Sequence, residues 1–165
     1  MAIRDLLLSE LEGEAGKTRA TLERVPAEKA DWAPHAKSMK LGKLAAHVAQ
    51  LGGFGVVMLT KPELDFATAG MKPLVFESAP KAVEAFNQGL AAVKAELAKL
   101  PDEAWTQPWT LHMGDQVFFS GSRFNAYRAM YLNHMVHHRA QLGVYLRLLG
   151  VPVPSVYGPS ADEGA

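Results

Sequence analysis

Apolar residues recur every three or four positions in four stretches of the chain, a spacing typical of amphipathic helices. The four predicted helices span residues 2–24, 40–60, 79–100 and 122–149. A proline lies just beyond each of the first three helices, and Gly150 follows the fourth. Proline cannot continue a helix, and glycine readily adopts the left-handed conformation that ends one. The pattern therefore predicts an all-α fold, a four-helix bundle.

Two of the connections between these helices carry further information. The connection over residues 61–79 is long, which favours an overhand crossover rather than a tight turn between the second and third helices. Between the third and fourth helices, residues 113–115 (Met-Gly-Asp) separate two short apolar runs and predict a short β-hairpin. Two strands alone are marginally stable, so the hairpin is expected to pack on the bundle. Three aromatic residues are interpreted as packing anchors rather than as a pocket wall: Trp105, Trp109 and Phe118.

Composition and length fit one globular domain over residues 1–165, with 48% hydrophobic and 21% charged residues. The 17 Lys and Arg residues balance the 17 Asp and Glu residues, which argues against a nucleic-acid-binding protein. The chain has no cysteine, which excludes disulfides, thiolate metal ligands and a cysteine nucleophile. It shows neither a signal peptide nor an apolar run of about eighteen residues, so no membrane span is expected and the cytoplasm is the predicted location.

Histidines occupy positions of the fourth helix where apolar side chains are expected. Steps of four and three residues give these a/d positions: Tyr127, Tyr131, His134, His138, Gln141, Tyr145 and Leu148. His134 and His138 are four residues apart, so their side chains lie on one face, whereas His137 points elsewhere. His47 holds a similar place on the apolar stripe of the second helix. The three imidazoles form either a metal site or three core histidines, each satisfied by a hydrogen bond.

Other polar residues near these histidines have two possible roles. Gln50, Gln141 and Asn133 could orient the imidazoles or could simply be solvated. Met135 stands where a zinc protease of the His-Glu-x-x-His type has its glutamate, which argues against that activity. No residue is an evident general acid or base.

Four further residues are assigned from their positions in the chain. His35 and His112 lie in predicted connections and are expected to be exposed. Arg139 is interpreted as a surface residue in an ion pair, with substrate binding as the alternative. Tyr157 and the proline-rich tail could fold back over the mouth of the bundle.

Three stretches, residues 38–49, 133–142 and 145–158, resemble the DinB/YfiT-like family of metal-dependent bundles. The resemblance implies an up-down-down-up bundle, a homodimer, and one divalent ion held by three histidines. On that pattern the ligands are His47, His134 and His138. Ala140 departs from the family, in which glycine is common at this position. Some relatives are transferases or isomerases that use low-molecular-weight thiols such as bacillithiol or mycothiol.

A metal held by three imidazoles keeps open positions, as catalytic sites do. Zinc or nickel suits these ligands best, with iron as an alternative. The first hypothesis is therefore a metal-dependent transferase of the thiol S-transferase type, acting on a small molecule. The alternatives are a non-catalytic metal-binding stress-response module and a structural bundle without a metal.

Overall fold

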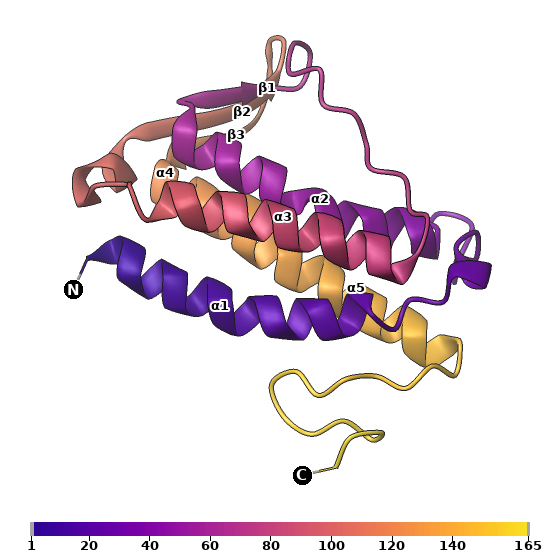
Figure 1. The fold of residues 1–165 in the computed structure, drawn as a ribbon. Helices are drawn as coiled ribbons and strands as arrows, with labels where there is room; N and C mark the ends of the chain where they lie inside the picture. Colours follow the sequence, from indigo (N-terminus) through magenta and orange to yellow (C-terminus); the bar gives the residue numbers. More distant parts are fainter. Residues whose placement is uncertain (1, 165) are drawn as a thin grey trace.

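Four long helices pack side by side in the computed structural model, which describes residues 2–164 (Figure 1). Their bounds are α1 Ile3–Leu22, α2 Leu41–Thr60, α3 Ala79–Leu97, and a last helix made of α4 Arg123–Ala126, η3 Tyr127–Leu132 and α5 Asn133–Leu148. Short 3₁₀ turns follow α1 and α3, at η1 Ala27–Lys29 and η2 Asp102–Thr106. In Figure 1, α2 and α3 run in one direction, and α1 and α5 run in the other. The predicted four-helix bundle is confirmed, and its arrangement is up-down-down-up.

A small three-stranded sheet covers one end of the bundle (Figure 1). Its strands are β1 Glu63–Asp65, β2 Pro108–Met113 and β3 Gln116–Ser122, in the order β1-β2-β3. The antiparallel pair β2–β3 is the predicted hairpin, with an irregular register between Leu111 and His112. The parallel strand β1 lies in a segment predicted to be a loop, so that part of the prediction was wrong. Three residues are too few to show the alternating pattern of a strand.

Two of the three hairpin aromatics are packing anchors, as predicted. Trp105 is 1% exposed and Trp109 is fully buried. The prediction was wrong for Phe118, which is 49% exposed. Successive side chains of a strand point to opposite faces, and the neighbouring Phe119 packs against Trp109, with a centroid distance of 6.3 Å.

Helices α2 and α3 approach each other closely because each carries a glycine at the contact. A Cβ atom added to Gly52 would lie 2.5 Å from the Cα of Gly89. By length and composition α2 could cross a membrane, but 61% of its most apolar window is buried in the bundle. Burial of this extent is typical of the core helix of a soluble protein.

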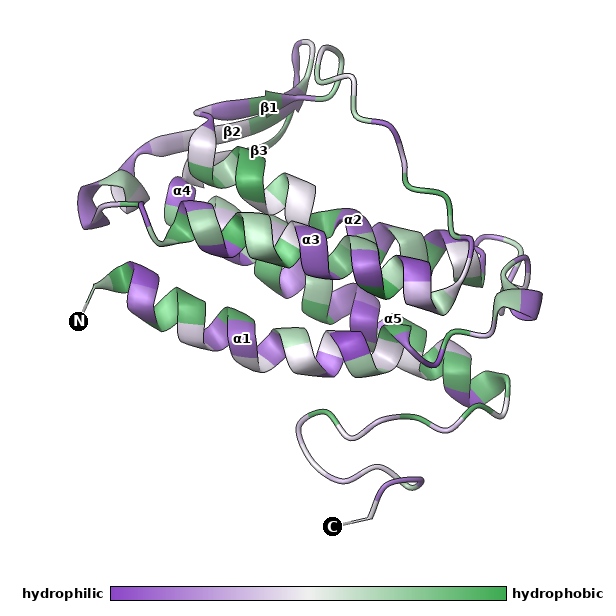
Figure 2. Ribbon diagram, in the orientation of Figure 1, coloured by the Kyte–Doolittle hydropathy of each residue, from purple (hydrophilic) through white to green (hydrophobic). Residues whose placement is uncertain are grey.

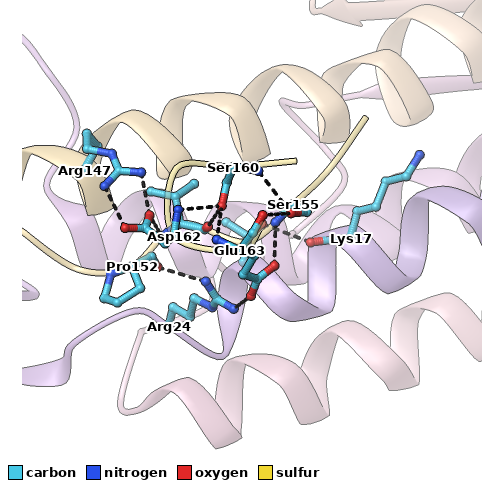
Figure 3. A network of polar contacts seen from close by, with 10 residues as sticks. Lys17, Arg24, Arg147, Pro152, Ser155, Ser160, Asp162 and Glu163 are labelled. Atoms are coloured by element: carbon cyan, nitrogen blue, oxygen red, sulfur yellow. Dashed lines mark hydrogen bonds and ion pairs between the residues drawn. The ribbon is translucent and has the colours of Figure 1, made fainter. Parts of the chain in front are cut away.

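The chain after α5 folds back along α1 and α5 without regular secondary structure. Figure 3 shows two arginines that hold it: Arg147 pairs with Asp162 at 2.5 Å, and Arg24 pairs with Glu163. The Ser155 amide also donates to the Glu163 carboxylate at 2.8 Å. The tail folds back, but along α1 and α5 and not over the mouth of the bundle as expected.

Candidate metal centre

The ligand-bearing part of the last helix follows directly on a π-helical segment, Tyr127–Leu132. Such segments are often found at functional sites. In α5 the buried face includes Met135, Leu142 and Leu146, whereas Leu148 is 60% exposed. The centre of the buried face therefore lies beside the predicted a/d positions, which are found at one edge of that face. The histidines consequently lie at the margin of the core rather than at its centre.

Three imidazoles from two helices meet at this margin. His47 projects from α2, and His134 and His138 project from successive turns of α5. The Nε2 atom of His134 lies 3.1 Å from that of His47 and 2.7 Å from that of His138. One ligand atom from each residue lies within 4.8 Å of the others. Sequence reasoning therefore identified three residues that the fold brings together.

Hydrogen bonds at the far side of two rings determine their tautomers. Nδ1 of His138 lies 2.7 Å from Oε1 of Gln141, and Nδ1 of His134 lies 3.3 Å from the carbonyl oxygen of Met130. These oxygens accept hydrogen bonds, which favours the tautomer in which each Nδ1 carries the proton. Each Nε2 then carries a lone pair, and the two lone pairs face each other.

This donor set fits a divalent metal ion. Two imidazole nitrogens bound to one ion at about 2.0–2.1 Å are separated by roughly 2.8–3.4 Å at ligand angles between 90° and tetrahedral. The His47–His134 spacing of 3.1 Å falls in that range, and the His134–His138 spacing of 2.7 Å is slightly shorter. A cation between the rings would bind both Nε2 atoms and so remove the repulsion between their lone pairs.

The surroundings also keep the imidazoles neutral. Burial, followed by the charges of His138, His134 and Lys43, lowers the pKa of His47 to about 4. Burial is also the largest cause of the lowered pKa values of His134 and His138, and their hydrogen bonds oppose it only in part. An unperturbed histidine has a pKa of about 6.5, so all three rings are neutral at pH 7. Neutral imidazole is the form that binds metals.

Of the predicted partners of the histidines, only Gln141 contacts one of them. The side chain of Gln50 instead accepts a hydrogen bond from the backbone of Leu74, at 2.7 Å. Asn133 is exposed and makes no side-chain hydrogen bond within residues 2–164. His137 is exposed and does not belong to the cluster, as predicted, although its ring lies 4.8 Å from that of His138.

The predicted ion pair of Arg139 is confirmed, but its predicted surface position and the predicted exposure of His112 were wrong. Arg139 is 3% exposed, because it lies about 100° around α5 from His138 and faces α1. There it pairs with Glu14 at 2.6 Å. His112 lies in β2 with its side chain only 20% exposed, near the carboxylates of Glu63 and Asp65. His35 is exposed, as predicted.

Tyr157 does not lie over the histidine cluster. Its hydroxyl donates to Glu14 at 2.7 Å and accepts from Arg139 at 2.9 Å, so the tail joins the contact between α1 and α5. Sequence reasoning did not single out Lys43, which lies one turn before His47 on α2. Its position four residues before a candidate ligand was the available signal.

Known proteins share this architecture. A family model described as the DinB family matches residues 1–165. YrdA, an uncharacterized protein of Bacillus subtilis, is 28% identical over 165 residues, which cover 98% of this chain and 92% of the relative. A crystal structure of a DinB-like protein from Bacillus cereus has a TM-score of 0.67 and 21% identity, over 91% of this chain and 95% of that one. For the DinB-like protein YjoA of Bacillus subtilis, the TM-score is 0.69 at 14% identity, over 92% and 96%.

Proposed function

The chain belongs to the DinB family, and we propose that it binds one divalent metal ion through His47, His134 and His138. The observation that carries the proposal is the convergence of three imidazoles, with the Nε2 atoms of His134 and His138 only 2.7 Å apart. Zinc and nickel suit three imidazoles best, and iron is the alternative. The Gln141 side chain and the Met130 carbonyl hold two of the rings with Nε2 directed at the ion.

The position of the cluster supports a small-molecule reaction. His47 and His134 are only half-buried, so a small molecule can reach the ion from solvent. When bound, the ion supplies Lewis acidity that lowers the pKa of a coordinated water or thiol. No carboxylate belongs to the histidine cluster in the described part of the chain. A thiol substrate suits such a site, because it needs no protein nucleophile and no strong general base.

We therefore propose a metal-dependent transferase of the thiol S-transferase type that acts on a small electrophile. The thiol loses its proton to solvent, its sulfur forms a bond to the electrophilic carbon, and the leaving group departs with the bonding electrons. A low-molecular-weight thiol is the proposed partner. A homodimer and a cytoplasmic location stay predictions.

Elemental analysis of protein purified without a histidine tag tests the metal proposal. We expect about one metal ion per chain in the wild type and in His137→Ala, which removes an exposed neighbouring imidazole. His138→Ala should retain almost none, because two ligands bind far more weakly than three. A wild-type metal content near zero would overturn the proposal and leave three core histidines.

Turnover of a panel of thiols and electrophiles tests the transferase proposal. Activity should require the metal and should disappear with a chelator and in His138→Ala. Activity that survives both changes would contradict it. A bound metal that stabilises the fold, without turnover of any pair, would favour the non-catalytic metal-binding module.

A further inference from the structure

One stripe of α2 runs through the histidine cluster. Its members are spaced by four, three and four residues, so they lie on one face of the helix: Lys43, His47, Gln50 and Phe54. On one side of this stripe is α5, which supplies His134 and His138. On the other side is the crossover segment, residues 66–78, whose exposed apolar part is visible in Figure 2.

Three contacts place the crossover segment along this stripe. The rings of Phe66 and Phe54 lie 6.0 Å apart at the end of α2 near the sheet. In the middle, the Leu74 amide donates to Gln50. Near the start of α2, a ring carbon of Phe76 lies so close to Gly42 that an added Cβ would be 3.2 Å from it. The stripe is therefore bordered by protein on both sides.

A recess of about 400 Å³ opens between the start of α2 and the crossover segment. Its walls include Leu74, Val75 and Phe76 on one side and Lys40, Lys43 and Asp31 on the other. The Lys40 ammonium lies 2.7 Å from the Asp31 carboxylate, so these two charges are matched. Lys43 makes no ion pair or side-chain hydrogen bond with any residue in the range 2–164. The recess thus has one apolar wall, and its other wall carries one unmatched positive charge.

This charge lies beside the metal centre. Side chains four residues apart on a helix have Cβ atoms about 5–6 Å apart. Lys43 and Leu74 both line the recess, and Leu74 bonds to Gln50, one turn after His47, so the recess borders the face of α2 that carries this histidine. A small molecule could therefore contact both the ion and this ammonium group.

We propose that the recess is an anion subsite of the metal centre, in which Lys43 binds a carboxylate of the substrate. The substrate class is then a small molecule whose carboxylate is a few bonds away from its metal-binding group. This inference rests on the proposed function, because the three histidines must hold the ion. It assigns to Lys43 the selection of carboxylate-bearing substrates among the small molecules that can bind the ion.

Three thiols of equal length and different charge test the subsite: mercaptopropionate, mercaptopropanol and mercaptopropylamine. Each is titrated into protein loaded with cobalt(II) or nickel(II), and the thiolate-to-metal absorption gives its dissociation constant. We expect the carboxylate to bind about fivefold more tightly than the alcohol, as for one partly exposed ion pair. We expect the amine to bind most weakly, and the preference to shrink as salt is added.

Substitutions then assign the preference to one residue. Lys43→Gln should bind the carboxylate and the alcohol equally, whereas Lys43→Arg should keep the preference. Lys99→Gln, at the far end of the bundle, is the matched control and should behave as the wild type. The metal content of each variant shows that loss of a cation near the site has not removed the ion.

The outcomes separate this inference from the proposed function. A protein that binds no metal overturns both. If the metal-loaded protein binds all three thiols with equal affinity, the anion subsite is overturned and the metal proposal is unaffected. The same holds if the preference for the carboxylate persists in Lys43→Gln. A carboxylate preference lost only in Lys43→Gln supports the subsite.

Discussion

Adjacent residues of α5 belong to two polar clusters that differ in one respect. Arg139 joins a cluster with Glu14 and Tyr157, in which positive and negative groups match and each hydroxyl or charge has a partner. His138 joins the cluster with His47 and His134, in which Nε2 atoms face one another. The first cluster pairs opposite charges from this chain. The second brings three imidazoles together with no group of opposite charge among them.

The difference indicates what each cluster is for. A buried polar group costs free energy unless it has a partner, so a fold retains such groups where partners are present or where something else binds them. The arginine cluster meets this requirement internally and joins α1, α5 and the tail. The histidine cluster contains no matching charge, and in the metal proposal a cation is its partner. Perturbations should therefore change stability at the first cluster and metal binding at the second.

The largest expected effect is stabilisation by metal. An ion that binds only the folded state, supplied at about a thousand times its dissociation constant, raises the free energy of unfolding by about 4 kcal/mol. Urea unfolding with and without zinc should show this gain in the wild type. His134→Ala should lose it, because one of three ligands is gone. A gain of equal size in His134→Ala would place the ion elsewhere and remove the contrast between the clusters.

The next largest effect should come from the arginine cluster. Glu14→Gln leaves the buried Arg139 without its matching charge and should destabilise the fold by about 3 kcal/mol, measured by urea unfolding. Glu12→Gln is the matched control, because the Glu12 side chain is 59% exposed in its pair with Lys94. It should cost less than about 1 kcal/mol. Similar losses of stability in both variants would show that burial of the Glu14–Arg139 pair does not increase its contribution to stability.

Local patterns were sufficient to predict most of this fold. The spacing of apolar residues and the prolines that follow the helices are encoded in neighbouring residues, and they give the four helices. His47, His134 and His138 could be predicted as a group because each lies at the edge of an apolar helical stripe. The family resemblance then assigned all three to one ion.

The residues that sequence reasoning misplaced depend on tertiary contacts. Arg139 looks like a surface residue until α1 places Glu14 opposite it. Strand β1 forms because β2 offers it a parallel partner. The π-helical segment before His134 changes which side of the helix is buried, and a regular repeat does not reveal it. Lys43 stands out only once the crossover segment borders α2.

A smaller effect is expected from Gln141, which orients one ligand. Gln141→Ala removes the hydrogen bond to Nδ1 of His138 and should weaken metal binding about 10–100-fold, measured by competition with a chelator. Gln50→Ala is the matched control, because Gln50 lies one turn from His47 but bonds to the crossover segment. It should leave the metal affinity nearly unchanged. Equal losses of metal affinity in the two variants would show that the hydrogen bond from Gln141 to His138 does not determine the affinity.

The smallest effect should come from Tyr157, whose hydroxyl bridges Glu14 and Arg139. Tyr157→Phe keeps the ring beside Lys17 and removes only the bridge, so the loss of stability should be about 1 kcal/mol. The Glu14–Arg139 pair remains and no charge is left unmatched. Metal affinity should stay at the wild-type value, because Arg139 faces α1 and the ligands face α2. A change in metal affinity would show that α5 couples the two clusters, and the separation between a structural and a metal-binding face would then fail.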